Sequence, residues 1–376
     1  KSMRFESFVA LRYLRGKRVL VTGAGGSIGS ELCRQLLSGG ADRLYLFGHG
    51  ENSIYEIDRE LRLLQEEGVG EKATIVPIIG EIQDADYMHF LLKRLRADVV
   101  LHTAAYKHVP LMEENPVAVV RNNVFGTHNL VQAAIQAGVD RFVFISTDKV
   151  VDPVSVYGAS KRIAEEIVLN AGAGSASPKS NAGRSGAKAG NFMVVRFGNV
   201  LSSRGSIVPL FQRQIARGGP VTVTHPDMKR YYMTIPEASS LVLQTGGVGQ
   251  AGGLYLLDMG EPLLIRELAE QLITFSGLTP YEDIDITYIG LRPGEKLSES
   301  LLSDDEECRN SPYERIMRIN RERWPQERMA TLLRRLGPVV FFDPEKPDLF
   351  RARRTLREIL SEYVPSLPIP EYEPQY

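Results

Sequence analysis

One stretch of the sequence gathers side chains that can move protons: residues 146–161, which read S-T-D-K-V-V-D-P-V-S-V-Y-G-A-S-K. Asp148 supplies a carboxyl group, Lys149 and Lys161 supply amines, and Tyr157 supplies a phenol. Tyr157 and Lys161 are four residues apart, so on a helix their side chains project from one face. These residue types and this spacing predict an acid–base site.

The stretch is expected to begin at the end of a buried strand and to continue as a helix. The apolar run R-F-V-F-I at 141–145 indicates a strand buried in a parallel sheet. Pro153 suits the first turn of a helix, where no hydrogen bond is lost. Because ligands of open parallel sheets bind at the carboxyl ends of strands, we place the chemistry at this strand end.

A glycine-rich loop near the start of the chain predicts a dinucleotide site. A strand at 18–22 leads into G-A-G-G-S-I-G, and a helix then runs to the glycine pair at 39–40. The glycines permit a tight turn, close approach of backbone N–H groups to a pyrophosphate, and close packing of helix on strand. The residues expected to contact the cofactor here are Gly23, Gly25, Gly26, Ser27, Ile28 and Gly29.

The end of the next strand, at 44–47, bears on the choice of cofactor. A carboxylate at this point binds the ribose 2′-hydroxyl of NAD. The sequence continues instead as G-H-G-E-N, with no acid at the strand tip and no arginine to hold a 2′-phosphate. His49 is either a contact to that phosphate or a solvated loop histidine. The residues leave NAD and NADP open.

Alternating strands and helices predict an α/β fold: a Rossmann doubly wound parallel sheet with a smaller C-terminal α+β substrate-binding domain. Further strands are expected at 74–79, 98–102 and 192–196, and further helices at 53–67, 84–96 and 117–137. The expected domains are a dinucleotide-binding domain at 16–197 with an inserted loop at 170–190, a partly interleaved substrate-binding domain at 198–330, and a helical tail at 331–376.

Composition excludes several classes of partner. The 376 residues carry a net charge of -1, which gives no field to attract nucleic acid or an anionic membrane. The two cysteines and six histidines show no metal-ligand spacing, so we expect no metal. No apolar run reaches the roughly 18 residues that span a bilayer, and no leader opens the chain, so we expect a cytoplasmic protein.

Several motifs in order carry a family resemblance. They are the glycine-rich loop, T-A-A-Y-K-H-V-P at 103–110, S-T-D-K at 146–149, Y-G-A-S-K at 157–161, R-F-G-N-V at 196–200 and R-P-G-E-K at 292–296. Together they resemble the extended short-chain dehydrogenase/reductases and, within them, the UDP-N-acetylglucosamine 4,6-dehydratases of bacterial polysaccharide biosynthesis. Some membrane-anchored relatives carry methionine at the position of Tyr157 and have preceding transmembrane segments, so the chain is similar to the soluble form.

The resemblance implies conversion of UDP-N-acetylglucosamine, or a close UDP-sugar, to the 4-keto-6-deoxy sugar. Hydride leaves sugar C4 for a tightly bound NAD or NADP, water is eliminated across C5–C6, and the same hydride returns to C6. The cofactor is therefore regenerated in each turnover. The expected partners are a UDP-sugar and further copies of the chain as a homo-oligomer, with no nucleic acid and no membrane.

In this reaction Tyr157 takes the proton of the C4 hydroxyl group, and Thr147 donates a hydrogen bond to the reacting oxygen. The pKa of a phenol, about 10, must fall for this role. Lys161 and the oxidised nicotinamide are expected to lower it, and Lys161 is also expected to hold the nicotinamide ribose.

Asp148 is expected to protonate the departing C6 oxygen, which requires a raised pKa. Lys149 is expected to remove the C5 proton, which requires a lowered pKa. The like charges of Lys107 and Lys161 are expected to lower it. The competing interpretation of Asp148 and Lys149 is a surface ion pair.

The resemblance also implies contacts along the rest of the site. Cofactor contacts beyond the glycine loop and His49 are expected from Glu81, Ile82, Thr103, Ala104, Ala105, Lys107, Asn122, Tyr157 and Lys161. Contacts to the sugar nucleotide are expected from Lys107, His108, Asn199, Arg204, Arg230, Arg292 and Glu295. Arginine suits a diphosphate because its planar fork donates two parallel hydrogen bonds.

Two other functions stay open. A sugar-nucleotide 4-epimerase or 4-ketoreductase needs Thr147, Tyr157 and Lys161 but uses neither Asp148 nor Lys149 as acid and base. A non-catalytic dinucleotide-binding module needs none of these five side chains.

Overall fold

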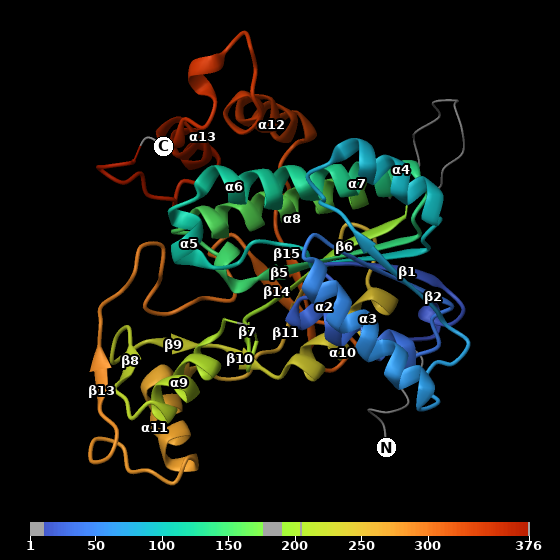
Figure 1. Ribbon diagram of the computed structural model, residues 1–376. Helices are drawn as coiled ribbons and strands as arrows, with labels where there is room; N and C mark the ends of the chain where they lie inside the picture. Colours follow the sequence, from blue (N-terminus) through green and yellow to red (C-terminus); the bar gives the residue numbers. More distant parts are fainter. Residues whose placement is uncertain (1–10, 176–189, 204, 375–376) are drawn as a thin grey trace.

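The computed structural model describes residues 11–175, 190–203 and 205–374 (Figure 1). Its centre is a nine-stranded sheet in the order β14-β15-β11-β6-β5-β4-β1-β2-β3. The strands from β3 to β11 run parallel, and β15 and β14 continue that edge antiparallel. The strands are β1 (Arg18–Thr22), β2 (Arg43–Gly48), β3 (Thr74–Ile79), β4 (Val99–His102), β5 (Arg141–Thr147), β6 (Asn191–Phe197), β11 (Leu254–Leu257), β14 (Glu307–Asn310) and β15 (Ile316–Asn320).

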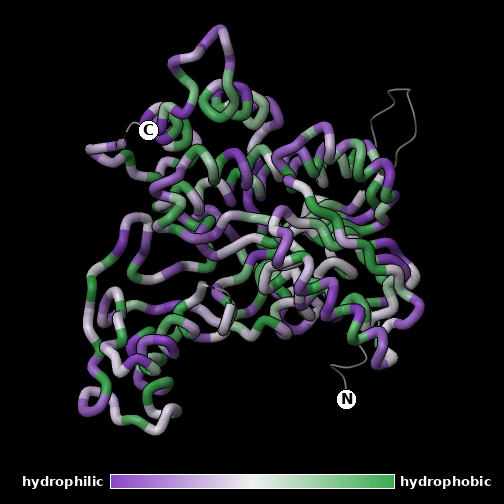
Figure 2. Tube along the Cα trace, in the orientation of Figure 1, coloured by the Kyte–Doolittle hydropathy of each residue, from purple (hydrophilic) through white to green (hydrophobic). Residues whose placement is uncertain are grey.

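The parallel strands are apolar because helices cover both faces of the sheet. All four residues of β4 are buried, and so are the five central residues of β5. Figure 2 shows hydrophobic residues concentrated along these central strands. The strand order reverses between β1 and β4, which pair with each other at Thr22 and His102. Such a reversal is where open α/β sheets bind ligands.

Two helical layers flank the sheet in Figure 1. On one face lie α4 (Ala85–Leu95), α6 (Pro116–Val120), α7 (Thr127–Gln136) and α8 (Val156–Ser175). On the other face lie α2 (Ser27–Ser38), α3 (Glu51–Glu66) and α10 (Ile235–Val248). The helix expected at 117–137 is present as α6 and α7, but a π-helical turn, η2 (Arg121–Gly126), joins them.

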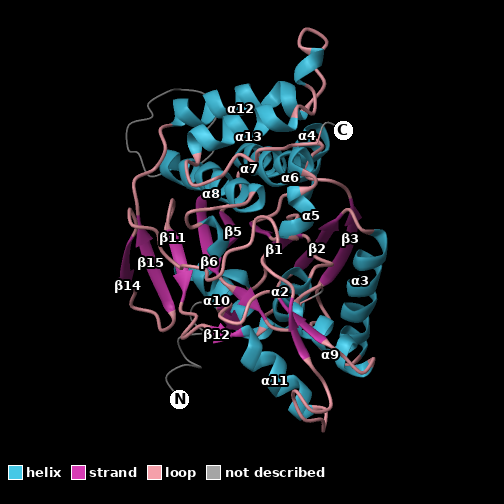
Figure 3. Ribbon diagram, turned by 90° about the vertical axis from the view of Figure 1, so that its left-hand side faces the viewer, coloured by secondary structure: helices cyan, strands magenta, loops and turns pink. Residues whose placement is uncertain are grey.

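A smaller lobe lies beside the carboxyl ends of the strands. It has its own core, in which Phe211 and Ile265 are fully buried. Figure 3 shows this lobe below the strands of the main sheet. Its elements are β7 (Asn199–Val200), α9 (Ile207–Ala216), β8 (Val221–Val223), β9 (Lys229–Arg230), β10 (Tyr232–Met233), β12 (Leu263–Leu264), α11 (Ile265–Phe275) and β13 (Ile286–Tyr288).

The main sheet and the small lobe are each built from several separate segments of the chain, so no single boundary at residue 198 divides them. After building part of the small lobe, the chain returns to the main sheet as α10 and β11, and it returns again as β14 and β15. The reason is that β11, L-Y-L-L, is buried throughout and therefore belongs inside a sheet covered on both faces. The expected sugar domain at 198–330 thus includes elements that complete the dinucleotide-binding sheet.

Two further expectations change. The loop expected at 170–190 begins later, because α8 continues to Ser175; residues 176–189 lie outside the described residues. The helical tail is present as α12 (Gln326–Val340) and α13 (Arg353–Tyr363), with a short turn η4 (Pro347–Leu349) between them. Both helices pack over α6 and α8. Within the described ranges, we find no helix with the length and apolar character needed to cross a bilayer.

A six-residue ion cluster locks the main sheet to α8. Arg196 of β6 is fully buried and binds Glu165 at 3.0 Å and Glu306 at 2.7 Å. Arg321 binds the same two carboxylates at 2.8 and 3.0 Å. Three guanidinium groups face three carboxylates in the cluster, which comprises Arg162, Glu165, Glu166, Arg196, Glu306 and Arg321. The cluster is therefore neutral.

We expect Arg196→Met to lower the free energy of unfolding by about 3–5 kcal/mol, because it leaves buried carboxylates without a counter-charge. Chemical denaturation measures this difference. Arg309→Met is the matched control, since Arg309 pairs with Glu307 where both side chains are more than 60% exposed (65% and 63%). That pair should contribute less than about 1 kcal/mol. Equal effects of the two substitutions would contradict the assignment.

Candidate active site

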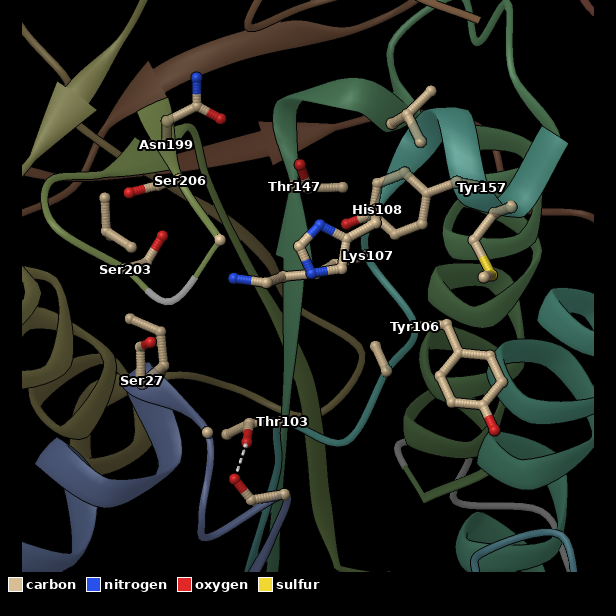
Figure 4. A pocket seen from close by; sticks show the side chains of 18 of the residues that line it. Ser27, Thr103, Tyr106, Lys107, His108, Thr147, Tyr157, Asn199, Ser203 and Ser206 are labelled. Atoms are coloured by element: carbon tan, nitrogen blue, oxygen red, sulfur yellow. Dashed lines mark hydrogen bonds between the residues drawn. The ribbon is translucent and has the colours of Figure 1, made fainter. Parts of the chain in front are cut away.

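A cavity of about 920 Å³ opens where the strand order reverses and extends between the main sheet and the small lobe. Figure 4 shows Thr147, Tyr157, Lys107 and His108 together in one part of it, with Ser27 and Thr103 at the opposite end. Every predicted site residue lines the cavity except Asp148, which is fully buried, and Arg204, which lies outside the described residues.

The glycine loop forms the cofactor end of this cavity. Gly23 has φ +67°, and a Cβ on it would lie 2.7 Å from the Thr103 hydroxyl oxygen. A Cβ on Gly29 would lie 2.1 Å from the Gly23 carbonyl oxygen. The loop can therefore bring its backbone against β4 only with glycine at these positions. Helix α2 begins at Ser27 beside the cavity, so its free N–H groups can bind a pyrophosphate.

The end of β2 does not decide between NAD and NADP. His49 lines the cavity and its ring packs edge-on against Tyr106, with centroids 6.3 Å apart. Glu81 and Ile82, at the end of β3, line the same region. As the sequence predicts, no carboxylate directly follows β2 before Gly50.

The π-helical turn places two buried asparagines against the loop after β4. Asn123 accepts a hydrogen bond from the Tyr106 N–H at 2.9 Å and donates to the Tyr106 carbonyl at 3.0 Å. It also donates to Ser160, which in turn donates to the Tyr157 carbonyl at 2.7 Å. Asn122, a predicted cofactor contact, lines the cavity and donates to Asn123 at 3.0 Å. The sequence indicates that Asn123, in a buried helical stretch, needs a partner, but it does not predict that Asn123 holds the loop after β4.

Tyr157 and Lys161 face the cavity from the first turns of α8, as their spacing predicts. The helix begins at Val156, three residues after Pro153. Lys161 Nζ donates to the Ile145 carbonyl oxygen of β5 at 2.6 Å and lies 4.0 Å from the centre of the Phe144 ring. Burial lowers the pKa of Lys161 from 10.5 to about 7, against the opposing effect of Glu165.

Asp148 and Lys149 form an ion pair directly after β5, in a 3-10 turn, η3 (Asp148–Val150), with Asp148 fully buried and Lys149 partly exposed. Lys149 Nζ donates to Asp148 Oδ1 at 3.0 Å and to Asn199 Oδ1 at 3.1 Å. Asp148 Oδ2 has no hydrogen-bond partner among the described residues and lies next to Gly198. Because the carboxyl group is fully buried and the amine lines the cavity, the surface ion pair does not describe this arrangement.

The direction of two pKa shifts differs from the expectation. Burial lowers the pKa of Lys149, but the carboxylates of Asp148 and Glu299 outweigh burial, so the pKa lies above its ordinary value. Burial raises the pKa of Tyr157, and the opposing effects of Lys149 and of a hydrogen bond to Thr147 do not cancel it. The expected lowering by Lys107 and Lys161 is therefore not what the protein's own charges produce. Without other charges, both groups keep their protons.

The residues expected to hold the sugar nucleotide have partners of their own. The Arg230 guanidinium donates to the carbonyl oxygens of residues 229, 296 and 297, and it also lines the cavity. Arg292 and Glu295 pair with each other at 2.6 Å. These two must exchange partners to reach a diphosphate or a ribose. Asn199 contacts Lys149, which ties this end of the cavity to the acid–base pair.

Two more cavity residues carry ionisable groups. Burial lowers the pKa of Lys107, and burial together with Lys107 lowers the pKa of His108. Glu299 is a residue that sequence reasoning missed. It is buried, its Oε2 atom has no hydrogen-bond partner among the described residues, and it acts on the pKa of Lys149. Glu299 lies far from Lys149 along the chain, so no local sequence pattern predicts that the two residues interact.

Comparisons with known proteins agree with this geometry. The model of the family described as "Polysaccharide biosynthesis protein" matches residues 19–321 of the chain. The capsular polysaccharide biosynthesis protein CapD of Staphylococcus aureus is 48% identical over 307 residues, and the probable polysaccharide biosynthesis protein EpsC of Bacillus subtilis is 49% identical over 293 residues. These matches cover 82% and 78% of this chain but 48% and 46% of the relatives. The chain therefore spans about half the length of these two proteins.

Relatives named as sugar-nucleotide enzymes are less similar. The UDP-N-acetylglucosamine 4,6-dehydratase (inverting) of Campylobacter jejuni is 28% identical, covering 81% of this chain and 83% of that protein. The UDP-glucose 4-epimerase of Rickettsia bellii is also 28% identical, covering 77% and 79%. The solved structure of Pen from Bacillus thuringiensis is 31% identical with a TM-score of 0.72, covering 82% of this chain and 90% of that chain. The predicted α/β fold is confirmed.

The lowered pKa of Lys161 predicts a pH dependence of stability. Between about pH 7 and its ordinary value the unfolded state binds a proton that the folded state does not, so the contribution of Lys161 to stability rises with pH. Below about pH 7, we expect Lys161→Met to have a higher free energy of unfolding than the wild type. Above about pH 7, this difference should shrink by up to about 1.4 kcal/mol per pH unit.

Denaturation curves from about pH 6 to about pH 9 measure this change. Lys72→Met, at an exposed lysine, is the control and should differ from the wild type by a constant amount. A constant difference for Lys161→Met as well would show that this lysine keeps an ordinary pKa.

Proposed function

Because the chain belongs to the polysaccharide biosynthesis family, we propose that it is a nucleotide-sugar 4,6-dehydratase. Its substrate is UDP-N-acetylglucosamine or a close UDP-sugar, and its product is the 4-keto-6-deoxy sugar. The observation that carries the proposal is the ion pair between fully buried Asp148 and Lys149, which lines, with Tyr157, a cavity that ends at the glycine loop. The likeness to the Campylobacter jejuni dehydratase supports it.

A dinucleotide fits the cofactor end of the cavity. The glycine loop would hold the pyrophosphate, since a Cβ on Gly25 or Gly29 would collide with protein atoms less than 3 Å away. Lys161 and Asn122 line the path from there to Tyr157. When bound, NAD or NADP supplies the acceptor for hydride from sugar C4 and returns that hydride to C6.

Tyr157 removes the proton of the C4 hydroxyl group. Its raised pKa means that the phenol must first lose its own proton, and the nearby ammonium group of Lys149 stabilises the phenolate that results. A positive charge on the oxidised cofactor acts in the same direction. Thr147, at the end of β5, provides a hydrogen bond that also favours the phenolate.

A single proton shift within the Asp148–Lys149 pair produces both the acid and the base. Moving a proton from Lys149 Nζ to Asp148 Oδ1, along their 3.0 Å contact, gives a neutral amine and a neutral carboxylic acid. A closed site without water favours this neutral pair, since it costs much less to bury than two charges. The raised pKa of Lys149 therefore describes the resting ion pair.

The elimination then balances without an external proton. The Lys149 amine takes the C5 proton, the C6–O6 bond breaks, and Asp148 gives its proton to the departing oxygen, which leaves as water. The pair returns to ammonium and carboxylate, its resting state. Hydride then adds to C6, a proton from solvent adds to C5, and Tyr157 releases the C4 hydroxyl proton to solvent, so that protons balance over the turnover.

A 4-epimerase or 4-ketoreductase is the alternative, and the equal identity to an epimerase does not exclude it. Those reactions need Tyr157, Thr147 and Lys161 but no buried acid and amine at the strand end. A non-catalytic module would need none of them. Homo-oligomer formation and a cytoplasmic location stay predictions from the sequence.

We expect the protein to convert UDP-N-acetylglucosamine to a product lighter by one water without added reductant. Deuterium placed at C4 of the substrate should be recovered at C6, and one solvent deuterium should enter at C5 in heavy water. Mass spectrometry and NMR of the product measure both. An unchanged mass with inversion only at C4 would identify an epimerase instead.

We expect Lys149→Ala to slow elimination by about 10²- to 10⁴-fold and C4 oxidation by less, through loss of the charge that stabilises the Tyr157 phenolate, so that reduced nicotinamide accumulates on the enzyme. Tyr157→Phe is the matched contrast, because it should block C4 oxidation and leave the cofactor oxidised. Absorbance of the bound nicotinamide in a single turnover separates the two. Normal dehydration by Lys149→Ala would refute the assignment of Lys149 as the base.

A further inference from the structure

The loop that joins Asp148-Lys149 to Tyr157 is held in place by a distant part of the chain. We infer that the C-terminal segment, defined as residues 353–373, positions Tyr157 against the Asp148–Lys149 pair, and that Glu113 is the positioning residue through which it acts. The inference rests on the proposed function for its consequence in catalysis. Its structural part can be tested without substrate.

Glu113 connects directly to the start of α8. It is the last residue of α5 (Val109–Glu113), and its Oε1 atom accepts a hydrogen bond from the Val156 N–H at 2.7 Å. Val156 is the first residue of α8 and precedes Tyr157. A carboxylate at this point satisfies a free N–H group and favours the positive end of the helix dipole. Glu113 thus fixes the direction in which α8 begins.

The C-terminal segment fixes Glu113 in turn. Arg357 Nη1 binds Glu113 Oε2 at 2.9 Å, and Arg353 and Arg357 both donate to the Glu113 carbonyl oxygen. The Glu373 carboxylate accepts a hydrogen bond from the Nε–H of each of these two arginines, at 2.6 Å in both cases. These arginine and glutamate side chains are at most 12% exposed, and their two positive and two negative charges balance. Loss of one charge would therefore leave another buried without a partner.

The same segment also holds the loop at a second point. Ser366 Oγ donates to the carbonyl oxygen of Pro153, at 2.9 Å. The Lys296 ammonium group binds the carbonyl oxygen of Val151. Residues 151–156 are thus tied at both ends and in the middle, between the acid–base pair and the phenol.

The consequence is a fixed distance between the groups that act on C4 and those that act on C5 and C6. A displacement of about 1 Å in an active site can cost about 100-fold in rate. The family match ends at residue 321, so the segment that provides this support lies outside the matched region. Packing of α12 and α13 on the main domain alone would not require buried charges aimed at the first turn of α8.

Glu373→Gln tests the inference without changing any residue of α5, of α8 or of the cavity. Hydrogen–deuterium exchange of the peptide covering residues 149–158 should become faster in this variant. The rate of dehydration per bound cofactor should fall at least about tenfold, with KM for the sugar nucleotide changed less than about twofold. Glu371→Gln is the control, since it removes the same charge from an exposed side chain two residues away.

Unchanged exchange in the 149–158 peptide would overturn the inference, whatever happens to activity. A lower melting temperature with normal exchange and a normal rate per bound cofactor would show a purely structural role and would also overturn it. If Glu373→Gln does not fold, Ser366→Ala should also speed exchange in the 149–158 peptide and lower the rate of dehydration, in both cases by a smaller factor. A wild-type protein that dehydrates no UDP-sugar would refute the proposed function, and the exchange measurement would still decide the inference.

Discussion

Charge balance inside the protein is the constraint on which the rest of the structure depends. The six-residue ion cluster joins β6, α8 and the segments that flank β14 and β15, and each of its charges would be costly to bury alone. Glu165 of this cluster also accepts a hydrogen bond from Ser146 at 2.6 Å. The cluster therefore reaches the end of β5, where Thr147 and Asp148 follow.

Buried charges are also balanced in the candidate site. Asp148 is tolerated in a fully buried position because Lys149 neutralises it, and the two groups can exchange one proton without changing their net charge. The group formed by Glu113, Arg353, Arg357 and Glu373 is neutral as well. The six-residue ion cluster and the group formed with Glu373 are thus both neutral, and both contact residues of the stretch 146–161. Within that stretch, the Asp148–Lys149 pair keeps a proton that can move between its two members.

Local signals in the sequence were sufficient for much of the fold. β1 and β3 begin and end where the apolar runs predict, and the glycines at 23 and 29 occupy positions where a side chain would collide with backbone. Contacts between distant parts of the chain could not be read in this way. Glu299 adds to the effect of Asp148 in raising the pKa of Lys149, and the place of β11 in the main sheet depends on pairing with β6 and β15. Neither leaves a periodic or turn signal near the residue concerned.

The chain passes between the main sheet and the small lobe four times, and short ladders connect these passages. β7 pairs with β10, β9 pairs with β12, and Lys229 bridges to Ser298. The lobe is therefore joined to the main sheet by several passages of the chain. Asn199 lies in the β7–β10 ladder and accepts a hydrogen bond from Lys149. A shift of this ladder relative to the main sheet would therefore alter the hydrogen bonding of the Lys149 amine.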